Sequence, residues 1–238
     1  MRDTLKILAI ADLHWYTNKE LRQIKNLDYN VCVLLGDIPV NAIRLIKEYV
    51  YNTPILAVAG NHDDWNTPEI GGAENIHGQC VECYGYKFTG FSGSALYKYG
   101  DYPMFTQRES MQLGNKLKKA DILISHDSGY QLLGKDKPHS GLLGIDLYNL
   151  KNRTKLNICG LYPVERNDEY IKYAQIHGSD TKINGYPTDV EISNKYIDFD
   201  STVIFYVTCE FARIYINDYM DISTIQLIVD RCKELGWN

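Results

Sequence analysis

The sequence predicts an α/β fold, and three observations support this prediction. In the first half of the 238-residue chain, short apolar segments alternate with segments whose apolar residues recur at helical spacing. The last third is dominated by strand-like segments. Apolar residues make up 45% of the chain and charged residues 23%, which is the balance of a globular protein with a sizeable core. Continuous apolar strands separated by helices are typical of a parallel sheet buried on both faces.

Three strands and two helices are expected in the first half, and each strand runs into a polar segment. The helical segments are indicated by apolar side chains spaced three and four residues apart. We expect strands at 5–12, 31–37 and 53–60, and helices at 18–27 and 40–51.

The middle of the chain mixes strands with capped helices. Thr106 and Glu109 form a capping box, so a helix is expected from there to about residue 119. A further helix is expected to end near residue 152. The strands expected in this part lie at 82–91, 120–126 and 155–159.

The last third is predicted to be mostly β. Segments 201–208 and 211–217 are expected to form adjoining strands, and a second capping box at 223–226 opens a final helix through residue 235. Segment 166–195 is polar and indicates no regular element. The sequence contains no internal repeat or linker, so we expect a single domain spanning residues 1–238.

Composition and charge argue against several classes of protein. The 25 basic and 30 acidic residues give a formal net charge of −5, without the basic surplus typical of nucleic-acid-binding proteins. A net charge does not report on a local basic groove. No apolar segment approaches the roughly 18 residues that cross a bilayer. The apolar run near the N-terminus contains Lys6 and lacks a cleavage site, so we expect a cytoplasmic protein with no membrane partner.

The six cysteines are scattered along the whole chain. Cys80 and Cys83 form a CxxC pair, but a zinc ribbon needs a second such pair, and a thioredoxin-like pair opens a helix rather than a strand. We therefore expect free thiols, most of them buried, rather than a zinc or redox site.

Polar side chains with metal-binding chemistry follow four of the predicted strands. Because the carboxyl ends of parallel strands lie at one edge of a sheet, we expect these side chains to gather there. Turns or helix caps explain Asp12, Asp37 or Asn61 taken singly, but not histidines at three of four strand ends. Carboxylate, amide and imidazole ligands suit Mn, Fe, Zn or Co. The seven residues are Asp12, His14, Asp37, Asn61, His62, Asp63 and His126.

The motifs that these residues form resemble those of the calcineurin-like metallophosphoesterases. The resemblance rests on Asp12-x-His14, Gly36-Asp37 and Gly60-Asn61-His62-Asp63, with spacers of about 25 residues. It continues in segments 86–94, 120–126 and 139–141, and it covers roughly residues 5–160. It implies a central two-sheet β-sandwich flanked by α-helices on both outer faces.

The resemblance also implies a site for two divalent metal ions, with Mn, Fe, Zn and Co as candidates. Asp12 and His14 would bind the first metal, and Asp37 would bridge both. Asn61 and His126 would bind the second. In such a site a hydroxide held between the metals attacks the phosphorus of a phosphate ester.

His62 is the leaving-group acid that the resemblance implies. An imidazole, with an ordinary pKa near 6.5, suits proton donation to a leaving oxygen at neutral pH. The neighbouring Asp63 would either orient His62 or cap a helix, and the sequence favours neither role.

The pattern departs from the family after the strand at 155–159. The family carries a Gly-His-x-His element there, and the spacing places it at Gly160. This chain has Gly-Leu-Tyr-Pro at 160–163, and leucine and proline side chains cannot ligate a metal. Segment 174–178 (Ala-Gln-Ile-His-Gly) resembles the missing element. His177 would then bind the first metal with Gln175 facing the second, or His177 is an ordinary loop histidine.

Two further segments bear on the substrate mouth. Such families often have Thr-His-x-Pro-Pro where this chain has Ser-His-Asp-Ser-Gly at 125–129, so Asp127 and Ser128 would alter that mouth. His139 would lie near the site, with a role in binding substrate or supporting a ligand, or it would lie on the surface.

These motifs favour a metal-dependent phosphoesterase acting on a phosphomono- or phosphodiester, with His62 as the acid. The departure at Gly160 leaves open an impaired enzyme that serves as a binding or regulatory module. A nuclease shares the same site chemistry and would need a basic groove, so nucleic acid is a partner that the charge does not favour. The sequence indicates no oligomeric state. The lysines that could line such a groove are Lys116, Lys118, Lys119, Lys135 and Lys137.

Overall fold

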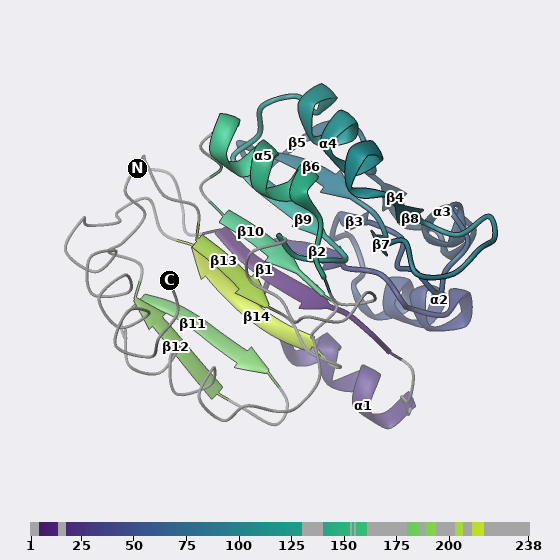
Figure 1. Ribbon diagram of the computed structural model, residues 1–238. Coiled ribbons are helices and arrows are strands. Elements are labelled where there is room, and N and C mark those ends of the chain that lie inside the picture. The colour runs from purple at the N-terminus through teal and green to yellow at the C-terminus, as the bar shows by residue number, and fades with distance from the viewer. Residues whose placement is uncertain are drawn as a thin grey trace.

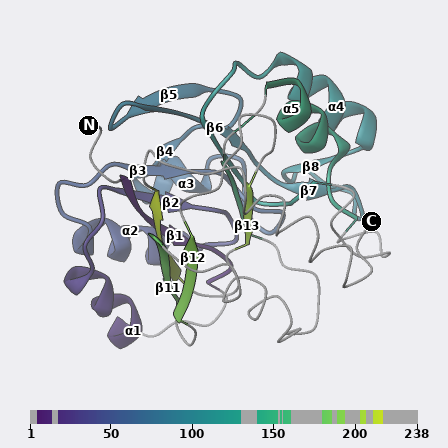
Figure 2. The same cartoon turned by 90° about the vertical axis from the view of Figure 1, so that its left-hand side faces the viewer.

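Two β-sheets face each other and carry helices on both outer faces (Figure 1), as the predicted fold class requires. The computed structural model describes residues 5–13, 18–129, 140–152, 154 and 156–160, and four later strands between residues 180 and 216. Figure 2 shows the layers from the side, with α1 and α2 next to one sheet and α4 and α5 next to the other. The helices are α1 Asn18–Arg22, η1 Gln23–Asn26, α2 Val40–Tyr49, α3 Thr67–Gly71, α4 Gln107–Lys116 and α5 Leu143–Asn152.

The first sheet, which we call sheet A, has seven strands in the order β12-β11-β14-β1-β2-β3-β4. β1 to β4 are parallel, as the alternation of strands and helices predicts. β14 joins β1 from the other side in antiparallel register, pairing Ile7 with Ile214. The strands are β1 Leu5–Ile10, β2 Val31–Leu34, β3 Ile55–Ala57, β4 Glu74–Asn75, β11 Asp180–Gly185, β12 Asp189–Ser193 and β14 Phe211–Ile216.

The second sheet, sheet B, has five strands in the order β13-β10-β9-β6-β5. β6, β9, β10 and β13 are parallel, and only the edge strand β5 runs antiparallel to its neighbour. A separate two-stranded sheet pairs β7 with β8. These strands are β5 Cys80–Cys83, β6 Tyr86–Phe91, β7 Ser94–Ala95, β8 Met104–Phe105, β9 Ile122–Ser125, β10 Leu156–Cys159 and β13 Val203–Tyr206.

Alternating side chains of β1 show how the layers are held together. Leu5, Ile7 and Ala9 belong to the apolar cluster between the two sheets. Leu8 and Ile10 belong to the cluster that packs against α1 and α2. Successive strand side chains point to opposite faces, so the part of β1 that is buried on both faces, Ile7 to Ile10, is apolar throughout. Full burial of each leucine or isoleucine side chain contributes roughly 1.5–3 kcal/mol.

The helices on sheet B are fixed by caps and close packing. The Thr106 hydroxyl accepts a hydrogen bond from the Glu109 backbone, and the Glu109 carboxylate accepts one from Thr106 N at 2.9 Å, so the predicted capping box is present. A third apolar cluster, with Leu123 from β9 and Tyr148 from α5, lies under these helices. In the described part of the chain, no helix combines the length and apolar character that a membrane span requires.

The expected strand at 82–91 is wrong as a single element. The structure has a hairpin, β5 and β6, joined at Tyr84-Gly85. Both linking residues have positive φ, 51° and 76°, the signs required by a two-residue type I′ turn. Tyrosine is an uncommon residue at such a position, so the usual Asn-Gly signal is missing from the sequence.

Three expectations for the last third have different outcomes. The strands near 203 and 211 exist but are not adjoining, because β13 pairs with β10 in sheet B and β14 pairs with β1 in sheet A. Apolar pattern marks a strand without choosing its partner. Segment 166–195 contains two strands, β11 and β12, where the sequence indicated no element. The helix expected at 223–235 lies outside the described residues.

Candidate metal centre

The candidate metal ligands lie where strands of both sheets end. Asp12 follows β1, Asp37 follows β2 and Asn61 follows β3, while His126 directly follows β9 of the facing sheet. All four side chains are buried, with His126 fully so. Strand ends of both sheets therefore bring these polar groups together, whereas the sequence predicts the edge of a single sheet.

Asp12 and Asp37 both adopt a backbone conformation that usually favours glycine. Each has φ of 53°, in the left-handed region, where a non-glycine residue is disfavoured by roughly 1–3 kcal/mol. Hydrogen bonds hold the two residues there. Asp12 N donates to Gly36 O at 3.1 Å, and Asp37 N donates to the Asp63 carboxylate at 2.8 Å. The chain retains a carboxylate at each position despite this backbone strain.

Two glycines allow the strand-end loops to touch. A Cβ atom at Gly36, whose φ is +91°, would lie 2.6 Å from His126 Nδ1 and 2.5 Å from Gly60 N. A Cβ atom at Gly60 would overlap the Asp37 carboxylate. Glycine therefore precedes both Asp37 and Asn61 because no side chain fits between the loops that carry them.

The buried side chains form a cluster of ligand atoms. Asp12, Asp37 and His126 each offer one atom, and these atoms all lie within 4.8 Å of one another. His126 Nε2 lies 3.7 Å from Asp37 Oδ2 and 2.8 Å from Asn61 Oδ1. A buried cluster of carboxylate, amide and imidazole groups is the donor set that suits a divalent metal such as Mn, Fe, Zn or Co.

The second ring nitrogen of His126 supports this assignment. Nδ1 lies 2.7 Å from the carbonyl oxygen of Leu35, and a carbonyl only accepts, so Nδ1 carries the proton. When a cation takes the place of a proton on Nε2, that nitrogen directs its lone pair toward the same point as the oxygens of Asn61 and Asp37. Lone pairs of Asp37, Asn61 and His126 that face one another suit a cation between them. A hydrogen bond from the other ring nitrogen to a backbone carbonyl is the usual means of orienting a metal-binding histidine.

The charges of the pocket also appear in the pKa of His126. Burial disfavours the charged imidazole, but the carboxylates of Asp37 and Asp12 outweigh it and hold the pKa above its usual value. A cluster of carboxylates that draws a proton onto a fully buried ring is one that attracts positive charge.

Asp63 connects two of the ligand loops. Its Oδ2 accepts hydrogen bonds from Gly60 N at 2.7 Å and from Asp37 N at 2.8 Å. Burial raises the pKa of Asp63 to about 6, against the lowering effect of the Gly60 hydrogen bond and with a further rise from the charge of Asp37. These contacts give Asp63 a positioning role for the loops, while its orientation of His62 stays a prediction.

His62 stands at the mouth of the cluster. Its side chain is 56% exposed, and its Nε2 lies 4.0 Å from Asp37 Oδ2. Its backbone N donates to Asp37 Oδ1 at 2.9 Å, which fixes the residue beside the ligands. An exposed imidazole next to a buried ligand cluster is accessible to a substrate that the cluster would hold.

This arrangement agrees with a comparison of sequences. The sequence pattern of the calcineurin-like phosphoesterases matches residues 5–170. The chain belongs to this family. A crystal structure of TT1561 of Thermus thermophilus is similar at 14% identity and a TM-score of 0.46, over 68% of this chain and 84% of that one. The comparison with curated proteins gives no match.

Several residues that the family resemblance suggested lie outside the described part of the structure. They include His177, the candidate for the remaining histidine ligand of the first metal. Gly160, where the family element would begin, is described and lies beside the site, because a Cβ there would be 2.9 Å from Leu35 O and 3.1 Å from Ala11 Cβ. The chain therefore leaves β10 at the edge of the ligand cluster. The residues outside the described ranges are His14, His139, Gln175 and His177.

Sequence reasoning missed two partners of the cluster. One is the Leu35 carbonyl, which orients His126. The other is Tyr97, whose hydroxyl accepts a hydrogen bond from Asn61 Nδ2 at 2.9 Å. A backbone carbonyl leaves no mark in the residue pattern. Tyr97 is one of 19 tyrosines and lies 36 residues after Asn61, so no spacing rule connects the two.

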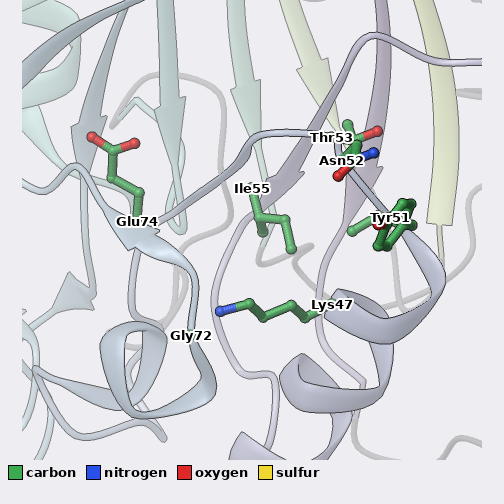
Figure 3. A pocket seen from close by; sticks show the side chains of 8 residues that line it. Lys47, Tyr51, Asn52, Thr53, Ile55, Gly72 and Glu74 are labelled. Carbon is green, nitrogen blue, oxygen red and sulfur yellow. The ribbon is translucent and has the colours of Figure 1, made fainter.

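A hollow of about 330 Å³ lies at the other end of sheet A (Figure 3). Ile55, the first residue of β3, lines it, whereas Asn61 follows the last residue of that strand. The hollow therefore does not contain the ligand cluster. Its lining residues are Lys47, Val50, Tyr51, Asn52, Thr53, Ile55, Gly72 and Glu74.

Proposed function

We propose that the chain hydrolyses a phosphomono- or phosphodiester in a metal-dependent reaction. The observation that carries the proposal is the buried cluster of Asp12, Asp37 and His126, with the Asn61 amide oxygen 2.8 Å from His126 Nε2. Membership of the calcineurin-like phosphoesterase family supports the reaction class. Phosphate-ester substrates and divalent metals follow from that class.

The described residues divide into two ligand groups in this proposal. Asp12 would hold one divalent metal ion and Asn61 with His126 a second, and Asp37 would lie between the two. When bound, such cations supply positive charge for the phosphoryl oxygens and an activated water nucleophile. His14 would add a ligand to the first site, and His177 is the candidate for its remaining position.

His62 is the proposed acid for the leaving group. Its imidazole is exposed at the mouth of the cluster, where an ester oxygen leaving the phosphorus would face it. Protonation of that oxygen prevents the build-up of charge on a poor leaving group. The Asp37 carboxylate accepts a hydrogen bond from His62 N and lies 4.0 Å from the His62 ring. These two contacts keep the imidazole, the proposed proton donor, next to the candidate metal ligands.

The decisive experiment measures hydrolysis of bis-p-nitrophenyl phosphate and p-nitrophenyl phosphate with added Mn²⁺. We expect turnover that needs the metal and falls at least 100-fold in Asp37→Asn, which removes a charge from the cluster centre. The matched control is Asp64→Asn, because Asp64 is exposed and lies in the same loop as Asn61. We expect it to retain turnover.

The opposite result has a definite meaning. The test repeats the turnover measurement with Mn²⁺, Zn²⁺, Co²⁺ and Fe²⁺ in turn. If the turnover of the natural chain is no higher than that of Asp37→Asn with any of these metals, the phosphoesterase proposal is wrong. The replacement of the family element by Gly-Leu-Tyr-Pro at 160–163 favours a binding or regulatory module in that case. A nuclease would instead cleave DNA or RNA with an affinity that falls steeply as salt rises.

A further inference from the structure

The loop that follows β7 is attached to the loop that carries Asn61. Two side-chain hydrogen bonds join them. Asn61 Nδ2 donates to the Tyr97 hydroxyl at 2.9 Å, and Trp65 Nε1 donates to Asp101 Oδ1 at 3.2 Å. Tyr97 therefore touches a candidate metal ligand directly, on the side away from His126.

The contact matters because the two ends of an amide differ. Only Asn61 Oδ1 can ligate a cation, and the Nδ2 group can only donate hydrogen bonds. In the structure Oδ1 faces His126 Nε2 at 2.8 Å, and Nδ2 faces Tyr97. With the opposite orientation, Nδ2 would donate to the His126 lone pair, and that bond would mask a ligand atom on each residue.

The segment that leads to Tyr97 is held by contacts that do not involve the Tyr97 hydroxyl. Leu96 N donates to Phe105 O at 2.9 Å, and Ala95 N donates to the buried Asp127 carboxylate at 3.2 Å. The Lys98 ammonium lies 5.5 Å from the centre of the Tyr97 ring. The hydroxyl is thus presented to Asn61 by a loop whose backbone is anchored on β8 and on the loop after β9.

We propose that Tyr97 is a positioning residue of the metal centre. Its hydroxyl accepts the hydrogen bond of Asn61 Nδ2 and so anchors the amide in the position from which Oδ1 meets the cation that Asn61 shares with His126. This inference rests on the proposed function, because it requires that the cluster bind a metal. It assigns to Tyr97 an effect on cation affinity that operates through Asn61 alone.

The test measures Mn²⁺ binding to the metal-free full-length chain by isothermal titration calorimetry. We expect Tyr97→Phe, which removes one oxygen atom, to weaken one Mn²⁺ site about tenfold or more, the usual size of an effect from a partner of a metal ligand. The matched control is Tyr99→Phe, because Tyr99 lies in the same loop and is 99% exposed. We expect its affinity to stay within twofold of the natural chain.

A double-mutant cycle separates positioning from a structural role. If Tyr97 acts through Asn61, the variant Asn61→Ala with Tyr97→Phe binds Mn²⁺ as Asn61→Ala does alone. If the two losses multiply, Tyr97 acts by another route and the inference is wrong. Thermal unfolding of each variant shows whether a loss of affinity reflects a loss of folded protein, and an affinity loss that merely follows unfolding also overturns the inference.

The outcomes distinguish this inference from the proposed function. Equal Mn²⁺ affinity in the natural chain and in Tyr97→Phe overturns the role of Tyr97 and leaves the phosphoesterase proposal standing. A natural chain that binds none of Mn²⁺, Zn²⁺, Co²⁺ and Fe²⁺ overturns both. A chain that binds Mn²⁺ with the expected Tyr97 effect but hydrolyses no ester supports the inference and contradicts the proposed reaction.

Discussion

The two sheets contribute to the metal centre in different ways. Sheet A supplies the carboxylates of Asp12 and Asp37 from backbone held in the left-handed region. Sheet B supplies His126 from a position without such strain, where its backbone N donates to Phe91 O at 3.1 Å. The charged side of the cluster therefore depends on loops that must be held in place, while the imidazole side extends a regular strand.

Each sheet has a buried aspartate that fixes its strand-end loops. Asp63 accepts hydrogen bonds from Gly60 N and Asp37 N in sheet A. Asp127, in the loop after β9 of sheet B, accepts hydrogen bonds from Ala95 N of β7 and from Ser128 N. The first joins two ligand-bearing loops, and the second joins the His126 loop to the segment before Tyr97. A buried carboxylate that accepts two backbone hydrogen bonds thus holds the ligand loops directly in sheet A. In sheet B it holds the segment that leads to Tyr97.

The largest expected effect comes from removing these aspartates in turn. Asp63→Ala leaves two buried N–H groups without an acceptor, which we expect to lower the free energy of unfolding by about 3 kcal/mol. It should also abolish Mn²⁺ binding, because Asp37 loses the bond that holds its strained backbone. Asp127→Ala should cost a similar amount of stability but weaken Mn²⁺ binding only about tenfold. Urea denaturation and calorimetric titration measure the two quantities.

Asp63→Asn is the control for this pair, because it keeps an acceptor oxygen at the same position. We expect it to retain most of the stability and measurable Mn²⁺ binding. If Asp127→Ala abolishes Mn²⁺ binding as completely as Asp63→Ala does, the difference drawn between the sheets is wrong.

The second effect concerns the junction between the sheets. Ala59 N, at the end of β3, donates to Ser92 Oγ at 3.0 Å, and Ser92 N, at the end of β6, donates to His77 Nδ1 at 2.9 Å. The His77 ring stacks on Phe105 at 6.0 Å between ring centres and also contacts Trp65. Burial lowers the pKa of His77 to about 4, so the ring is neutral in the folded chain at neutral pH.

This shift makes the junction sensitive to acid. The unfolded chain takes up the His77 proton near the ordinary pKa of 6.5, and the folded chain does so only near 4, so stability is complete above about pH 6.5 and falls as the pH drops toward 4. We expect a loss of about 2 kcal/mol at pH 5 relative to pH 7. The measurement is urea denaturation at both pH values for the natural chain and His77→Gln. If stability depends on pH equally in the two proteins, His77 is not the group that makes the junction sensitive to acid.

The sequence predicted the candidate ligands that sheet A carries, but not the groups that contact those ligands. Asp37 and Asn61 could be found because each follows a glycine at the end of an apolar strand, and the structure explains both glycines by contact between the loops. Tyr97 and the Leu35 carbonyl could not be found, because their roles arise from contacts between segments far apart in the chain. For the same reason, apolar pattern located β13 and β14 without revealing that they lie in different sheets.

The smallest effect tests whether the metal centre depends on local geometry or on overall stability. Thr106→Ala removes the capping box of α4, on the outer face of sheet B, and should lower the free energy of unfolding by about 1 kcal/mol. Because Thr106 makes its capping contacts with Glu109 and not with any strand-end loop, Mn²⁺ affinity should not change. A parallel fall in affinity would mean that cation binding follows global stability, and the losses in Asp63→Ala would then need no strained loop to explain them. An unchanged affinity leaves the backbone of Asp12 and Asp37 as the feature on which the charged side of the centre depends.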